Sequence, residues 1–128
     1  MKLPHLQQWT EARRKVAAAY DRLFTQVPGV TIPKIAKDRT HVYHLYVIRT
    51  ENRDALKQHL NKSGVATMLN YPKALPFYPA YAYLGHKPAD FPNAFHNQSR
   101  ILSLPIYPEM TDDMIRRLVD TVAACMKG

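Results

Sequence analysis

Apolar residues recur every three or four positions between Leu6 and Phe24, with charged residues between them. This spacing predicts an amphipathic helix, which buries one face and leaves the charged face in solvent. Its apolar positions are Leu6, Trp9, Val16, Tyr20, Leu23 and Phe24. Pro28-Gly29 ends the helix, and we expect Val30–Lys37, which Pro33 interrupts, to form an edge piece or a loop.

The next segment, His41–Ile48, carries β-branched and aromatic residues at both odd and even positions. Strand side chains point alternately to two faces, so this pattern predicts a strand that is covered on both sides. Thr50 is expected to cap a following helix that runs to about Ser63, because a threonine oxygen accepts a first-turn N–H. Gly64 ends that helix, and Val65–Leu69 is expected to be a second strand.

The last third of the chain predicts a short helix over Asn93–Arg100, a strand over Ile101–Leu104 and a closing helix capped by Thr111. The apolar stripe of the closing helix consists of Met114, Ile115, Leu118, Val119, Val122 and Met126. Helices thus alternate with short strands along the whole sequence. We therefore expect a single α/β domain over residues 1–128, with a small mixed sheet of about three strands covered by helices.

Between the second strand and the short helix lies a segment dense in proline and tyrosine. Its alternating residues are Tyr71, Pro72, Pro76, Tyr78, Pro79 and Tyr81. Proline fixes φ and lacks an N–H, so this segment is neither a helix interior nor a central strand. A stiff loop loses little further entropy when it is held in place, and its aromatic rings offer flat surfaces to a ligand. We expect the function to lie here.

The composition narrows the class of protein and of partner. With 46% hydrophobic and 22% charged residues, this is the composition of a globular domain. The net charge of +8 favours an anionic partner, such as a nucleic acid, a membrane surface or a phosphorylated small molecule. The sequence shows neither a signal peptide nor an apolar run of membrane-spanning length, and its lone Cys125 fits a reducing compartment. We therefore expect a cytoplasmic protein without membrane contact.

Two chemistries find little support in the spacing of residues. His41 and His44 are three apart on a predicted strand, so they point to opposite faces, and the other histidines are isolated; we expect no metal site. The basic residues are spread along the chain, whereas the tyrosines cluster among prolines. This separation argues against a nucleic-acid surface, in which aromatic and basic residues interleave.

Several segments are recognisable in order. They are the opening helix with Trp9, Arg13-Arg14 and Tyr20, the strand HVYHLYVIR, the turn GVATMLNYP, Pro79-Ala80-Tyr81, Asp90-Phe91-Pro92 and the close ILSLPIYPEMTDD. This series resembles the C-terminal small domain of the DegT/DnrJ/StrS-type sugar aminotransferases. One motif departs from the family form His-Tyr-Pro-x-Pro-x-His, because Asn70, Ala74 and Pro76 replace its first histidine, second proline and last histidine.

The resemblance implies the small domain of a fold type I enzyme that depends on pyridoxal phosphate (PLP) and transfers an amino group from glutamate to a nucleotide-linked keto-sugar. It implies that the lysine that binds PLP lies on a preceding large domain, which this sequence does not include. None of the nine lysines here has the family's lysine context, so we expect no catalytic and no cofactor-binding residue, and no PLP binding by this chain alone.

The resemblance places the segment after the second strand at the substrate cleft, where the candidates for substrate binding are Asn70, Tyr71 and Lys73, followed by His44 and Tyr46. An amide and a phenol suit sugar hydroxyls, and an ammonium suits a phosphate. The alternatives are that Tyr71 packs into the core, that Asn70 only satisfies a turn, and that Lys73 is solvated.

Three hypotheses for function follow. The first is the C-terminal domain of a nucleotide-sugar aminotransferase involved in polysaccharide or antibiotic synthesis, inactive alone and completed by a separate large-domain polypeptide. The second is a stand-alone module that binds a sugar nucleotide or a protein without catalysis. The third is a basic nucleic-acid binder. Family members are typically dimers, which leaves a homodimer open for this chain.

Overall fold

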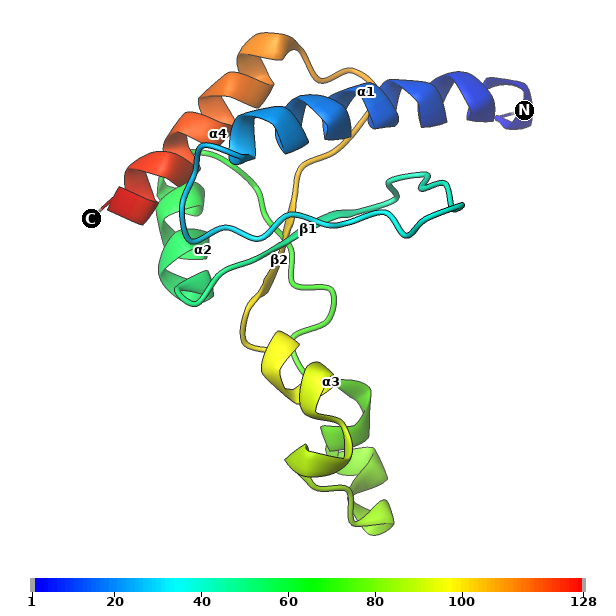
Figure 1. Cartoon of the computed structure of the whole chain (residues 1–128), viewed down its shortest axis with the longest axis vertical. Helices are drawn as coiled ribbons and strands as arrows, with labels where there is room; N and C mark the ends of the chain where they lie inside the picture. The colour runs from blue at the N-terminus through cyan, green and yellow to red at the C-terminus, as the bar shows by residue number, and fades with distance from the viewer. Residues whose placement is uncertain (1, 128) are drawn as a thin grey trace.

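The computed structural model describes residues 2–127. The helices are α1 (Leu6–Phe24), α2 (Arg53–Lys62), α3 (Pro92–Asn97) and α4 (Asp112–Lys127), and the strands are β1 (Tyr46–Arg49) and β2 (Ile101–Leu104). Of four short 3-10 turns, η1 (Leu3–His5) precedes α1, and η2 (Leu75–Phe77), η3 (Pro79–Leu84) and η4 (Pro88–Asp90) lie between α2 and α3. The predicted bounds of the first helix and of the strand at 101–104 are confirmed. Figure 1 shows α1, α2 and α4 gathered at one end of the molecule.

The sheet is antiparallel and pairs β1 with β2, so that Tyr46 faces Leu104 and Ile48 faces Leu102. One isolated bridge flanks each strand: Thr31 pairs with Arg49, and Met68 pairs with Ser103. An α/β fold is therefore confirmed, but the described sheet has two strands and is not mixed. The strand expected at Val65–Leu69 is reduced to the single bridge at Met68.

The strand expected over His41–Ile48 begins only at Tyr46. The backbone N–H and carbonyl groups before Tyr46 hydrogen-bond to side chains and not to a neighbouring strand. The Tyr43 N–H donates to Nδ1 of His41 at 2.8 Å, and Tyr43 has a positive φ of 49°. The side chains of Arg13 and Arg14 donate to the carbonyls of Val42 and His41, at 3.2 and 2.9 Å. Long side chains of α1 thus take the place of a neighbouring strand.

The core lies on one face of the sheet. Its buried side chains include Tyr46, Ile48, Leu102 and Leu104 from the strands, Val16, Tyr20 and Phe24 from α1, Leu56 and Leu60 from α2, and Ile115, Leu118, Val119 and Val122 from α4. On the opposite face Ser103 is buried, Val47 and Ile101 are half-buried and Arg49 is exposed. The prediction of a strand covered on both sides is therefore wrong for the described residues, whose helices cover one face.

The two predicted helix caps differ in outcome. Thr111 precedes α4, and its Oγ1 accepts the N–H of Met114 at 3.3 Å, which confirms the cap. Thr50 is not a cap: α2 begins later, after Asn52, and the Thr50 N–H instead donates to the carbonyl of Arg100 at 3.0 Å. Pairing with the chain that leads into β2 holds Thr50 in extended structure and delays the helix.

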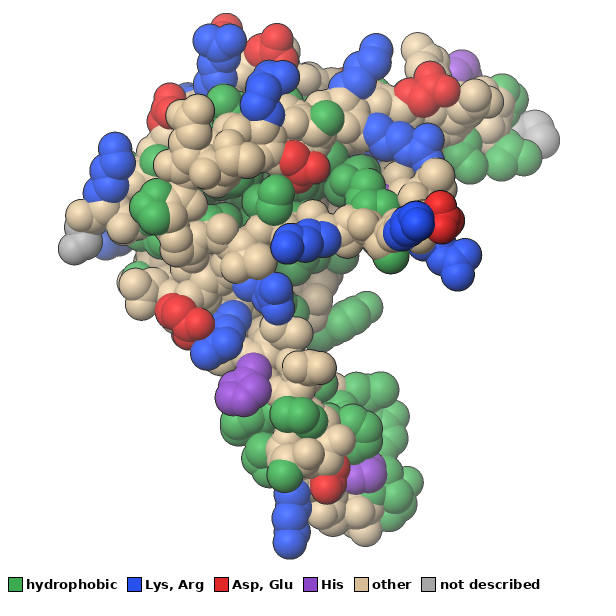
Figure 2. All heavy atoms as spheres, viewed as in Figure 1, with side chains coloured by type: hydrophobic (Ala, Val, Ile, Leu, Met, Phe, Trp, Pro, Cys, Tyr) green, Lys and Arg blue, Asp and Glu red, His purple; other side chains and the backbone are tan. Residues whose placement is uncertain are grey.

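Residues 70–100 form an arm that projects away from α1, α2 and α4 (Figure 1). It contains η2, η3, η4 and α3, and none of its residues is buried. Aromatic contacts hold it together: Phe77 meets Phe95 edge-on at 5.5 Å, and His86 meets Phe91 at 4.9 Å. Figure 2 shows hydrophobic side chains gathered on this arm, whereas the basic side chains are spread over the body. Prolines in this segment lack an N–H donor, which keeps its helical elements short and leaves it outside the sheet.

Candidate functional site

The candidate segment Asn70–Lys73 lies where the chain leaves the body and enters the arm. Tyr71 is 74% exposed, so the alternative in which it packs into the core does not hold. Lys73 is also exposed. The side-chain oxygen of Asn70 is buried but has no hydrogen-bond partner among the described residues, so it does not satisfy a turn. The phenol of Tyr71 and the ammonium of Lys73 are thus open to a ligand, while the oxygen of Asn70 is unpaired but enclosed.

Lys73 opens onto a pocket of about 360 Å³ on the arm. The pocket is lined by Lys73, Pro76, Phe77, Tyr78, Pro79, Tyr81, Ala82 and His86. Aromatic rings and prolines form its walls, and Lys73 and His86 supply nitrogen atoms at its rim. Such a surface can hold a sugar or a base by its apolar face while the ammonium meets a phosphate oxygen.

The two remaining candidates lie elsewhere. His44 is exposed and lines a different pocket, of about 520 Å³, together with Arg13 and Tyr107; this pocket shares no lining residue with that of Lys73. Tyr46 is fully buried, and its hydroxyl donates to Oδ1 of Asp21 at 2.6 Å. Burial and this bond raise the pKa of Tyr46 well above its usual range. Tyr46 is therefore a core residue, and its proposed contact with a substrate is corrected.

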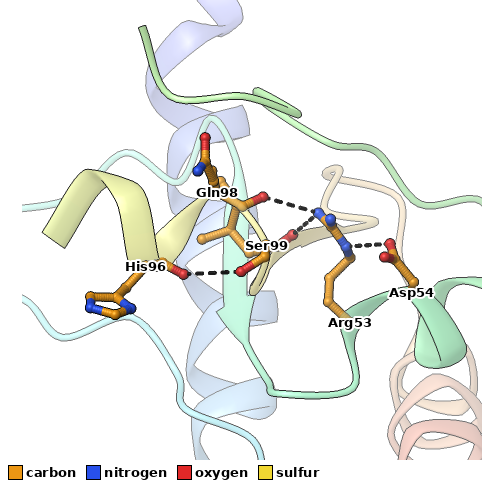
Figure 3. A network of polar contacts seen from close by, with 6 residues as sticks. Arg53, Asp54, His96, Gln98 and Ser99 are labelled. Carbon is orange, nitrogen blue, oxygen red and sulfur yellow. Dashed lines mark hydrogen bonds and ion pairs between the residues drawn. The ribbon is translucent and has the colours of Figure 1, made fainter. Parts of the chain in front are cut away.

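The sequence analysis did not identify the residues that hold the arm. The side-chain oxygen of Gln98 accepts the N–H of Ala74 at 3.0 Å, across 24 positions of sequence. The carbonyls of Gln98 and Ile101 accept from the guanidinium of Arg53, which is 7% exposed (Figure 3). No local signal could have revealed Gln98, because a lone glutamine near a helix end is an ordinary surface residue. A charged residue on the otherwise apolar face of α2 was the only available hint at Arg53.

The small antiparallel sheet, the helices on one of its faces and the projecting arm match the corresponding part of solved aminotransferases of fold type I. The solved structure of S. venezuelae DesV in complex with a ketimine intermediate matches with a TM-score of 0.92 and 34% identity, covering 99% of this chain and 34% of that one. Residues 1–123 match the DegT/DnrJ/EryC1/StrS aminotransferase family, and the chain belongs to this family.

Two curated relatives illustrate the match. A pleiotropic regulatory protein of Geobacillus stearothermophilus is 42% identical over 96% of this chain. The dTDP-3-amino-3,4,6-trideoxy-alpha-D-glucose transaminase of Streptomyces venezuelae is 35% identical over 95% of it. The chain spans about a third of the length of these relatives, 34% of the first and 32% of the second. It thus corresponds to a partial domain of such an enzyme.

The lysines of this chain do not lie in enclosed surroundings. A lysine that binds PLP as an imine is held in an enclosed site beside groups that orient the cofactor. All nine lysines of the chain lie between residues 2 and 127, and none is buried. The described residues also hold no group of histidine, cysteine or carboxylate side chains that could bind a metal ion, and none of their helices is long and apolar enough to cross a membrane.

Proposed function

We propose that the chain is the substrate-binding small domain of a PLP-dependent nucleotide-sugar aminotransferase, which in its intact form transfers an amino group from glutamate to a keto-sugar carried by a nucleoside diphosphate. The observation that carries the proposal is the match, over nearly the whole chain, to transaminases whose names specify dTDP-linked sugars, at 35% and 31% identity. PLP would be held by the part of the enzyme outside this sequence, and the chain alone would be catalytically inactive.

The segment Asn70–Lys73, in which Tyr71 and Lys73 are exposed, would make the substrate contacts. The amide of Asn70 and the hydroxyl of Tyr71 can each donate and accept, as sugar hydroxyls require. The ammonium of Lys73 would meet a phosphate oxygen of the diphosphate. Because these three groups have no hydrogen-bond partners within the described residues, binding breaks no existing side-chain bond.

The open face of the sheet supports a separate large-domain partner. Met68 is 62% exposed there, beside the half-buried Val47 and Ile101. Buried strands with one open apolar face usually pack against another layer. Since the relatives are about three times as long as this chain, we propose that the rest of the enzyme, as a separate polypeptide, covers this face. We further propose that the complex works in the cytoplasm, and a homodimer remains an open arrangement.

The proposal can be tested by titrating the isotope-labelled chain with dTDP-glucose, UDP-N-acetylglucosamine and PLP, following its amide resonances. We expect saturable shifts in residues 70–73 with at least one sugar nucleotide and none with PLP. Lys73→Ala should weaken binding by about twofold to fivefold, the range of an exposed ion pair, while Lys87→Ala, which removes another exposed lysine of the arm, should not. If neither sugar nucleotide shifts residues 70–73, the chain does not bind substrate through this segment.

A further inference from the structure

Gln98 joins the two chain segments that form the base of the arm. Its side-chain Oε1 accepts the N–H of Ala74, on the outgoing segment, at 3.0 Å. Its main-chain carbonyl accepts a hydrogen bond of 3.4 Å from Nη1 of Arg53, on the body. Gln98, on the returning segment, is therefore hydrogen-bonded both to the outgoing segment and to Arg53, the first residue of α2.

Arg53 makes two further polar contacts besides its bond to Gln98. Its Nη1 also donates to the carbonyl of Ile101 at 3.2 Å, and its Nε pairs with Oδ1 of Asp54 at 2.6 Å (Figure 3). The guanidinium is buried, while the carboxylate of Asp54 stays largely in solvent. One planar group thus holds the first residue of β2 and the end of the arm together. A lysine has no second nitrogen with which to pair Asp54 while the first meets both carbonyls, and it lacks the fixed geometry of the guanidinium.

Two anchors flank the candidate ligand segment: the backbone pairing of Met68 with Ser103 before it and the bond from Ala74 to Gln98 after it. In the described part of the chain, residues 70–73 make no hydrogen bond of their own, and Ala74 is the next residue with an anchor to the returning chain. We propose that Gln98 is a positioning residue, which holds Asn70–Lys73 in the arrangement that meets the ligand, with Arg53 as its support. The effect on binding rests on the proposed function above, whereas the mechanical link does not.

Three variants separate this role from general stability. Gln98→Ala removes the acceptor for Ala74, and Gln98→Glu keeps an oxygen there. Asn93→Ala changes an exposed residue of α3, the helix that ends just before Gln98, and Asn93 makes no side-chain hydrogen bond. A neutral hydrogen bond corresponds to about twofold to tenfold in an equilibrium constant, so amide exchange at Ala74 should quicken by about that factor in Gln98→Ala. It should stay near the wild-type rate in the other two variants.

The same proteins are then titrated with dTDP-glucose. Gln98→Ala should raise the Kd by about twofold to tenfold, and Gln98→Glu should restore it. Arg53→Lys should quicken exchange at Ala74 as well, while thermal melting by circular dichroism reports whether each variant is folded.

The outcomes are distinct. Unchanged exchange at Ala74 in Gln98→Ala overturns the link. Faster exchange with an unchanged Kd overturns the positioning role but leaves the proposed function standing. If the wild-type chain binds no sugar nucleotide, the proposed function and the effect on binding both fail, and the exchange rates still decide whether the link exists.

Discussion

Removal of the Tyr46 hydroxyl tests how much its hydrogen bond to Asp21 contributes to the stability of the core. Tyr46 is fully buried and its hydroxyl donates to Asp21 at 2.6 Å, while the Tyr46 ring lies 4.9 Å from that of Tyr20. Tyr46→Phe removes the bond and keeps the ring. A hydrogen bond to a charged group contributes about 1.5–3 kcal/mol to stability. Because Asp21 is only half-buried, water replaces part of the loss, and we expect a cost near the lower end, about 1.5 kcal/mol.

The assay is urea unfolding followed by far-ultraviolet circular dichroism near neutral pH. Tyr83→Phe is the matched control, because Tyr83 is 80% exposed and its hydroxyl has no partner among the described residues; it should change the free energy of unfolding by less than about 0.5 kcal/mol. A double-mutant cycle with Asp21→Ala isolates the pair. If Tyr46→Phe costs no more than Tyr83→Phe, the bond to Asp21 contributes nothing and the reasoning is refuted.

The pH dependence of the same pair gives a second test. Burial and the bond to Asp21 raise the pKa of Tyr46, so the folded protein holds the hydroxyl proton more tightly than the unfolded chain does. The advantage of the wild type is therefore complete below about pH 10 and is lost as the pH rises further, by about 1.4 kcal/mol per unit. Phenylalanine does not titrate, so wild type and Tyr46→Phe should converge near about pH 11. A constant difference up to that pH would contradict the cause assigned to the shift.

Two further substitutions test the core and a helix end. Leu60→Ala removes a fully buried side chain and should lower the free energy of unfolding by about 2–5 kcal/mol in urea titrations, whereas Met68→Ala, at a side chain 62% exposed, should cost less than about 1 kcal/mol. Thr111→Ala removes the acceptor of the Met114 N–H and should cost about 1 kcal/mol, while Thr111→Ser should retain most of that stability. If Leu60→Ala and Met68→Ala lower the free energy of unfolding equally, the role given to Leu60 is refuted. The same holds for Thr111 if Thr111→Ala and Thr111→Ser have equal effects.

The expected strand at His41–Ile48 illustrates why part of the fold escaped prediction. Its residue types favour a strand along its whole length, yet Arg13 and Arg14 of a distant helix bind its first carbonyls and His41 binds its next N–H. Residue types report which conformations suit a backbone, and they do not report which partners compete for its polar groups. The same reason explains why Thr50 pairs with the chain before β2 instead of capping α2.

For the candidate site, the sequence singled out Asn70–Lys73, whose role in binding stays a prediction, but it did not show how this segment is held. Prolines predicted a stiff, non-helical loop, and the structure shows an arm on which Tyr71 is exposed. Tyr46 was misjudged because a tyrosine on a strand can point either to the core or to solvent. Its complete burial and its bond with Asp21 place it in the core.

The amino-acid sequence by itself determined the elements whose signals are local: the apolar period of α1 and α4, the cap at Thr111, and the proline-rich arm. The tertiary structure alone decided how many strands pair, which face of the sheet stays open, and that Gln98 joins the two sides of the arm. The difference has a physical cause. Periodicity and capping depend on neighbours within one or two turns, whereas pairing and burial depend on groups far apart in the chain, whose contacts exist only once the chain has folded.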